Sequence, residues 1–161
     1  MFYLDLFRAL NDHQVRYLVV GGLAMNLHGV PRMTMDVDLV LAMDEENLDR
    51  FIACAEQMKL APVAPVKLVD LKDPQQRKQW AEEKHMVAFG LQAPAAGAPL
   101  LDILIAPAID LAAGFQRKVV RTVGDIAVDV AAIEDLIALK QAAHRRQDLD
   151  DIEHLERLRD Y

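Results

Sequence analysis

The chain has 161 residues, a length that suits one domain, and a domain of about 150 residues buries roughly 68–70% of its unfolded surface. Its 53% hydrophobic and 27% charged residues are typical of a globular protein, and no apolar run approaches the roughly 18 residues of a transmembrane helix. The net charge of −7 argues against non-specific nucleic-acid binding, because that affinity comes from Lys and Arg neutralising phosphates.

Two further features indicate the compartment. The N-terminal residues lack the basic region of a signal peptide, and the single Cys54, in a helical context, is expected to be a buried small hydrophobe. We therefore expect a cytoplasmic protein with no membrane segment.

The first third of the chain alternates helices and strands. Hydrophobic periodicity predicts a helix over 2–14, a buried strand over 16–20, a helix over 22–28, a strand over 35–41 and a helix over 45–59. Asp44 is the expected N-cap of the last of these, and acids follow it in the first turn, where the helix dipole favours them.

The rest of the chain adds strands and then helices. Residues 66–84 are the hardest segment to interpret: 67–71 reads as a strand or a helical turn, whereas Asp73-Pro74 predicts a capped helix. The remaining elements are expected at 87–92, 100–106, 108–115, 118–122, 126–130, 133–143 and 148–159, with 118–130 as a hairpin. This order predicts an α+β (α/β) fold, a mixed β-sheet flanked by helices with a C-terminal helical pair.

Gly21 and Gly22 lie between the first strand and the following helix. A glycine pair lets the backbone approach a ligand closely, and a helix N-terminus offers free N–H groups to phosphate. The alternative is a plain tight turn, so the pair alone is weak evidence for a phosphate site.

Three carboxylates interrupt apolar runs. Asp36 and Asp38 alternate in MDVDLVL, and a strand places such residues on one face, roughly 6.5–7 Å apart. Adjacent acids repel unless a cation or proton lies between them, and Mg²⁺ is the natural cation for an all-oxygen site. An edge strand with a polar face is the alternative for these two acids. Asp102 repeats the pattern in a later strand and could complete a shared site.

Together these motifs resemble the DNA polymerase beta-like nucleotidyltransferase superfamily, in particular its AbiEii/AbiGii-type toxin family. The residues that carry the resemblance are Gly21, Gly22, His28, Gly29, Arg32, Thr34, Asp36, Asp38 and Asp102. Residues 133–140 are similar to the family's downstream helix ending in a lysine, and Arg145, Asp148 and Asp151 resemble its R…D..D element. Gln147 stands where that element has a lysine, and the likeness is weak over 60–95.

The resemblance implies a single nucleotidyltransferase domain over 1–161, with the helices of about 131–161 packed on the catalytic core. It implies that Asp36, Asp38 and Asp102 are catalytic and hold Mg²⁺, or Mn²⁺ in its place. The NTP substrate would be bound by Gly21, Gly22, Arg32, Thr34 and Lys140. His28 is expected to anchor a loop rather than to catalyse.

The function that follows is transfer of a nucleoside monophosphate from an NTP to a hydroxyl of an acceptor, either tRNA or a protein, by the toxin of a toxin–antitoxin or phage-defence system with a cognate antitoxin. One alternative is an antibiotic nucleotidyltransferase of the lincosamide or aminoglycoside type. Another is a non-catalytic nucleotide- or partner-binding module of the same fold.

Overall fold

The computed structural model describes residues 2–143 and 146–160, so Arg145 and its predicted role lie outside the described residues. The helices are α1 (Phe2–Asp12), α2 (Gly21–Leu27), α3 (Glu45–Gln57), the 3₁₀ helix η1 (Leu68–Lys72), α4 (Pro74–Glu83), α5 (Leu111–Gln116), α6 (Ile133–Ala143) and α7 (Arg146–Arg159). The strands are β1 (Tyr17–Val20), β2 (Val37–Leu41), β3 (Ala61–Pro62), β4 (Ala88–Gln92), β5 (Leu100–Leu104), β6 (Val119–Val123) and β7 (Ile126–Val130).

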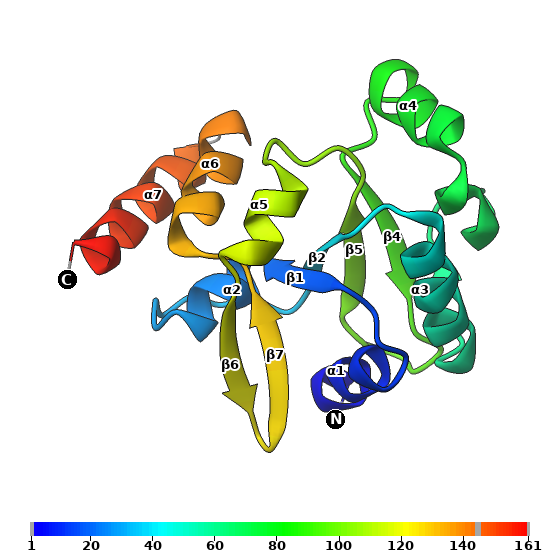
Figure 1. The fold of residues 1–161 in the computed structure, drawn as a ribbon, viewed down its shortest axis with the longest axis horizontal. Helices are drawn as coiled ribbons and strands as arrows, with labels where there is room; N and C mark the ends of the chain where they lie inside the picture. The colour runs from blue at the N-terminus through cyan, green and yellow to red at the C-terminus, as the bar shows by residue number, and fades with distance from the viewer. Residues whose placement is uncertain (1, 144–145, 161) are drawn as a thin grey trace.

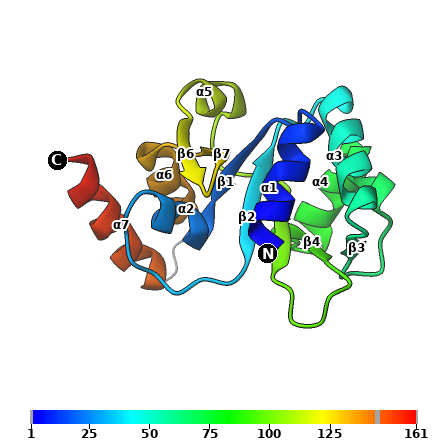
Figure 2. The same ribbon diagram turned by 90° about the horizontal axis from the view of Figure 1, so that it is seen from below.

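The seven strands form one mixed sheet in the order β3-β4-β5-β2-β1-β7-β6. Strand β1 is antiparallel to β2, whereas the pairs β2–β5 and β1–β7 are parallel. Helices α3 and α4 lie at one side of the molecule and α2, α6 and α7 at the other, as Figures 1 and 2 show. The predicted mixed sheet with flanking helices is confirmed. None of the helices within the described ranges has both the length and the apolarity needed to cross a bilayer.

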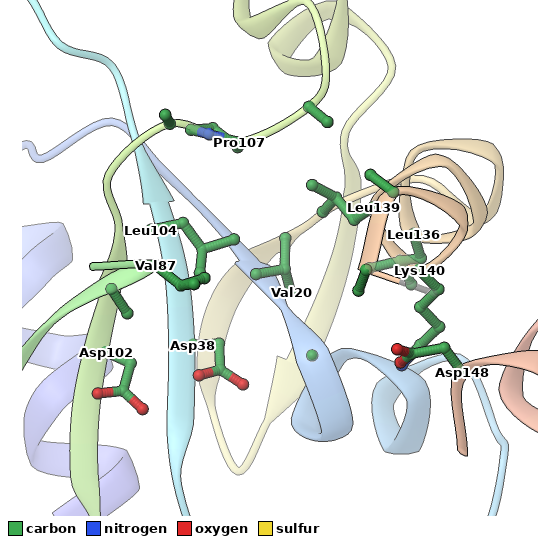
Figure 3. Close-up of a pocket in the computed structure, with 16 residues that line it drawn as sticks. Val20, Asp38, Val87, Asp102, Leu104, Pro107, Leu136, Leu139, Lys140 and Asp148 are labelled. Carbon is green, nitrogen blue, oxygen red and sulfur yellow. The ribbon is translucent and has the colours of Figure 1, made fainter. Parts of the chain in front are cut away.

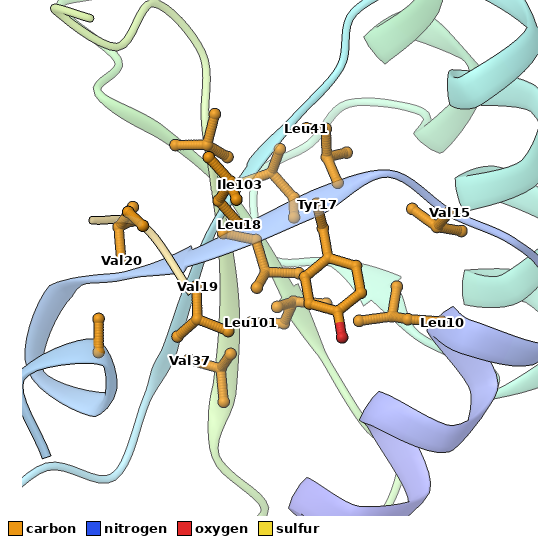
Figure 4. Close-up of a cluster of buried hydrophobic side chains, with 14 of the residues drawn as sticks. Leu10, Val15, Tyr17, Leu18, Val19, Val20, Val37, Leu41, Leu101 and Ile103 are labelled. Atoms are coloured by element: carbon orange, nitrogen blue, oxygen red, sulfur yellow. The ribbon is translucent and has the colours of Figure 1, made fainter. Parts of the chain in front are cut away.

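The sheet has a core face and an open face. On β4 and β5 the buried side chains alternate with less buried ones, and Phe89, Leu91, Leu101 and Ile103 are all fully buried. Helix α1 covers part of this core, with Leu10 near Tyr17 in Figure 4. The period of two therefore puts Gly90 and Asp102 on the opposite face, away from the core.

A buried asparagine ties β1 and β2 to the start of α3. Asn47 Oδ1 accepts a hydrogen bond from the Arg16 backbone N–H at 2.7 Å, and its Nδ2 donates to the Arg16 and Ala42 carbonyl oxygens at 3.0 and 2.8 Å. The predicted Asp44 N-cap is confirmed, since its side chain accepts from the Asn47 backbone N–H at 3.1 Å. These bonds satisfy backbone groups where the two strands meet the helix.

Several predictions about individual residues are confirmed or corrected. Cys54 is buried as expected, and burial raises the pKa of its thiol to about 11. Trp80 is 3% exposed and packs on Phe89 at 5.4 Å between ring centroids. Of the two alternatives for 67–71, the helical turn is confirmed, since Leu68–Lys72 form the 3₁₀ helix η1. The prediction that Asp36 lies in the second strand is wrong, because β2 begins at Val37 and Asp36 precedes it.

Candidate active site

Two carboxylates meet on the open face of the sheet. Asp38 on β2 and Asp102 on β5 are directly paired across parallel strands. Residues in such register share a face, and neighbouring strands lie about 4.8 Å apart. Figure 3 shows both carboxyl groups side by side and pointing the same way. Two residues 64 positions apart in sequence thus form one acid pair.

The electrostatics of the pair follow from this closeness. Burial raises the pKa of Asp102, the negative charge of Asp36 raises it further, and a hydrogen bond with the Asp38 side chain acts in the opposite direction. The raised pKa of Asp102 therefore reflects a carboxyl group that is partly buried and lies beside like charge.

The negative charge of Asp36 raises the pKa of Asp102, but the Asp36 side chain makes its hydrogen bond elsewhere. It is exposed, and its Oδ1 accepts a hydrogen bond from the Leu100 backbone N–H at 3.1 Å, which ties the loop before β2 to the start of β5. Within the described residues, no three His, Cys, Asp or Glu side chains are grouped so that they could hold a metal ion. The structure therefore brings two of the three predicted acids together and places the third beside them.

The glycine pair makes room for this site. Gly21 has φ +69°, a left-handed conformation, and a Cβ there would overlap the Asp38 Oδ2 atom. A Cβ on Gly22 would lie 2.9 Å from Thr34 Oγ1 and 3.4 Å from Arg32 Nε. The two glycines thus let β1 and α2 lie directly against the acid strand and against the loop that precedes it.

The predicted nucleotide-binding cations, Lys140 and Arg32, both bind acids of α7. Lys140 is 8% exposed, and its Nζ lies 2.8 Å from Asp151 Oδ2 and 3.7 Å from Asp148 Oδ1. Arg32 pairs with the same Asp151 oxygen through Nη1. One ion network therefore joins Arg32 of the loop before β2, Lys140 of α6 and the two acids of α7 at the edge of the site.

A cavity of about 650 Å³ opens beside the acid pair. Its polar lining is Gly21, Asp38, Asp102, Lys140 and Asp148, and its apolar lining includes Val87, Leu104, Pro107, Leu136 and Leu139. In Figure 3, Asp38 and Asp102 lie on the sheet side of the cavity, and Lys140 and Asp148 lie on the opposite side. Apolar residues lie between and above them. This volume is within the range of roughly 300–1,000 Å³ for small-molecule sites.

His28 acts as the anchor that the sequence predicted. Its Nε2 lies 2.8 Å from the Ala131 carbonyl oxygen, and burial lowers the pKa of the ring. The hydroxyl of Thr34 donates a long hydrogen bond of 3.4 Å to the Asp36 carbonyl oxygen. His28 thus fixes the end of α2 to the junction between β7 and α6, away from the acid pair.

Comparison with protein families decides the identity. Residues 5–161 match the model of the family described as "Nucleotidyl transferase AbiEii toxin, Type IV TA system". The chain belongs to the AbiEii nucleotidyltransferase family. The match spans nearly the whole sequence, so this AbiEii-family chain is a transferase, and the resemblance inferred from its motifs is confirmed.

Solved structures show the same fold. The AbiEii-family chain is similar to the crystal structure of ANT(2")-Ia in complex with adenylyl-2"-tobramycin, at 16% identity and a TM-score of 0.59 over 98% of this chain and 92% of that one. It is also similar to an antigenic nucleotidyltransferase-like protein from Paracoccidioides brasiliensis, at 20% identity and a TM-score of 0.55 over 93% and 71% of the chains. A comparison with curated protein sequences finds no match.

The acid pair fits a divalent cation by its donor chemistry. Mg²⁺ prefers oxygen ligands and is commonly held by one or two carboxylates together with substrate phosphates, a set that Asp38 and Asp102 can begin. Two carboxyl groups on directly paired residues also repel when both are ionised, and a cation between them would relieve that repulsion. Asp36 Oδ1 accepts the Leu100 N–H, and the second oxygen of this carboxylate could join such a set.

Some contributors to the site were not found from the sequence. Gly90 lies opposite Asp102 on β4, and Val87, Leu136 and Leu139 line the cavity. A glycine inside a predicted strand was a usable signal, because such glycines often mark a close approach. The apolar lining residues carry no comparable signal, since they read as ordinary core positions.

Proposed function

We propose that this AbiEii-family chain uses Mg²⁺, or Mn²⁺ in its place, to transfer a nucleoside monophosphate from an NTP to a hydroxyl group of an acceptor. One observation carries the proposal: Asp38 and Asp102 are paired on adjacent strands at the wall of a 650 Å³ cavity, beside the bare backbone of Gly21. Membership of the family supports the reaction class.

In this proposal the two paired acids have different tasks. Asp38 and Asp102 would hold the cation together, and Asp36 could join them through its second carboxylate oxygen. Asp102 also receives the proton of the acceptor hydroxyl, a role that suits a carboxyl whose pKa is raised. The acceptor oxygen bonds to the α-phosphorus, the bond between the α- and β-phosphates breaks, and pyrophosphate leaves. The cation, when bound, neutralises phosphate charge.

The remaining residues bind the nucleotide. Gly21 and Gly22 present backbone to the triphosphate, and Thr34 supports the loop beside them. Lys140 lines the cavity, so its ammonium group lies within the space that the nucleotide would occupy. Because Arg32 and Lys140 both pair with Asp151, each must exchange or share that partner to contact phosphate.

The biological setting follows from the family. We propose a cytoplasmic toxin that forms one nucleotidyltransferase domain over 1–161, is neutralised by a cognate antitoxin and modifies tRNA or a protein. The charge of −7 makes a local rather than a general nucleic-acid contact the expected mode for a tRNA acceptor.

The test is a transfer assay with each α-labelled NTP, with and without Mg²⁺, and with total RNA, cell lysate, tobramycin or a lincosamide as acceptor. Asp38→Asn and Asp102→Asn should abolish labelling, whereas Asp125→Asn, in the exposed turn between β6 and β7, should not. Labelling of only the antibiotics would support the resistance-enzyme alternative. Mg²⁺-dependent NTP binding without any transfer would support a non-catalytic module and contradict the proposal.

A further inference from the structure

Four residues form a row across the open face of the sheet. Val20, Asp38, Asp102 and Gly90 occupy paired positions on β1, β2, β5 and β4. Directly paired residues share a face, and their side chains are neighbours. Asp102 therefore has a carboxyl group on one flank and a residue without a side chain on the other.

The backbone gives no reason for a glycine at position 90. Its φ is not in the left-handed region, unlike those of Gly21, Gly29, Gly97 and Gly124. A glycine inside a strand weakens the strand, because it has no side chain to pack and loses more conformational freedom on folding. An alanine could adopt the same backbone conformation and would stabilise the strand if its methyl group had room.

The methyl group meets one tight contact. A Cβ at position 90 would lie 3.2 Å from Asp102 Oδ1, whereas its next neighbours, Val63 Cγ2 and Cβ, lie at ordinary distances of 3.6 and 3.7 Å. To relieve the contact, the Asp102 carboxyl must move away from β4, and Asp38 lies on that side. Bringing two carboxylates closer together increases their repulsion.

We propose that Gly90 is a positioning residue for Asp102. Its missing side chain leaves the Asp102 carboxyl in the place from which it takes the acceptor proton and shares the cation with Asp38. This inference rests on the proposed function for its catalytic consequence, but the contact itself does not depend on that function. Because small displacements of a reacting group can slow turnover strongly, Gly90→Ala should lower kcat by about tenfold.

The kinetic test compares Gly90→Ala with Gly114→Ala. Gly114 in α5 is buried and, like Gly90, has no positive φ, but a Cβ there would meet its neighbours only at 3.6–3.7 Å. We expect Gly90→Ala to lower kcat while KM for the NTP stays within about twofold, because the change acts on the reacting group rather than on ground-state binding. Gly114→Ala should keep both constants. An unchanged kcat for Gly90→Ala would overturn the inference.

A second test uses thermal unfolding of the metal-free, nucleotide-free protein. In the wild-type background, Gly90→Ala should leave the melting temperature unchanged or lower it. In an Asp102→Ala background, which removes the obstructing oxygen, the same substitution should raise it by about 2–4 °C. An equal change in both backgrounds would show that the methyl group does not contact Asp102 and would overturn the inference.

The two tests also separate this inference from the proposed function. If the wild type transfers no nucleotide to any acceptor, the proposed function fails, and the unfolding comparison still decides whether Gly90 sets the place of Asp102. If Gly90→Ala does not fold, restoration of folding by Asp102→Ala supports the contact, and its failure to restore folding contradicts it.

Discussion

Replacing Lys140 with methionine tests whether the ion network at the edge of the site stabilises the fold. The side chain of Lys140 is 9% exposed, and those of its partners Asp148 and Asp151 are 1% and 10% exposed. Removing one member of a buried pair leaves an uncompensated charge and costs about 3–5 kcal/mol. Because Arg32 still neutralises Asp151, we expect the loss of unfolding free energy to lie at the lower end of that range, at about 3 kcal/mol. In a domain of this size that loss lowers the melting temperature by about 6–12 °C.

The assay is urea and thermal unfolding of the nucleotide-free protein. Lys78→Met is the matched control: Lys78 is exposed on α4, so the same substitution there should change the free energy of unfolding by no more than about 0.5 kcal/mol. A Lys140→Met protein that unfolds like the wild type but binds NTP weakly would refute the reasoning. Lys140 would then act only as a phosphate ligand, and its pairs with the α7 acids would contribute nothing to stability.

Three more predictions follow from the structure. Gly21→Ala should abolish NTP binding, measured by calorimetry, and lower stability by at least about 1–2 kcal/mol, because φ is +69° and the new Cβ lies 2.9 Å from Asp38 Cγ; unchanged binding would contradict this geometry. Asn47→Leu should lower the free energy of unfolding in urea by about 2–3 kcal/mol, since the buried Ala42 carbonyl and the part-buried Arg16 N–H lose a hydrogen bond, whereas the Arg16 carbonyl keeps the Ala42 N–H; a loss below about 1 kcal/mol would show that water replaces the asparagine. Burial raises the pKa of Asp102, so ionisation destabilises the folded state and stability falls as pH rises through that raised pKa. Metal-free Asp102→Asn should therefore melt above the wild type near neutral pH, and the difference should disappear as pH falls below about 3.9; a difference independent of pH would contradict the assigned pKa direction.

The sequence by itself determined the elements and the reaction class. Hydrophobic periodicity, the Asp44 cap and the glycines after the first strand are local signals. Apart from the short strand β3, which was not predicted, and η1, which was left undecided, the helices and strands lie within a few residues of where those signals predict them. The motif from Gly21 to Asp38 resembled that of the family, and its residues belong to one continuous segment made of a strand, a short helix, a loop and a second strand. Such features need no knowledge of distant residues.

Only the tertiary structure decided which charges meet. Alternation in MDVDLVL predicted that Asp36 and Asp38 share a face, but β2 begins at Val37, and Asp36 instead accepts a hydrogen bond from Leu100. The partner of Asp38 is Asp102, brought beside it by the parallel pairing of β2 with β5. The order and register of strands depend on long-range packing of their buried faces, which local periodicity does not encode.

Long-range packing also decides which partners the cationic side chains of Lys140 and Arg32 have. Lys140 reads in sequence as the last basic residue of an amphipathic helix, and the family pattern assigns it to phosphate. Its burial against Asp148 and Asp151 depends on how α6 and α7 fold back on each other, and Arg32 reaches Asp151 from 119 residues away. The sequence thus determined which chemical groups the site contains, whereas the tertiary packing decided which of them lie together, because a charge takes its partner from its neighbours in space.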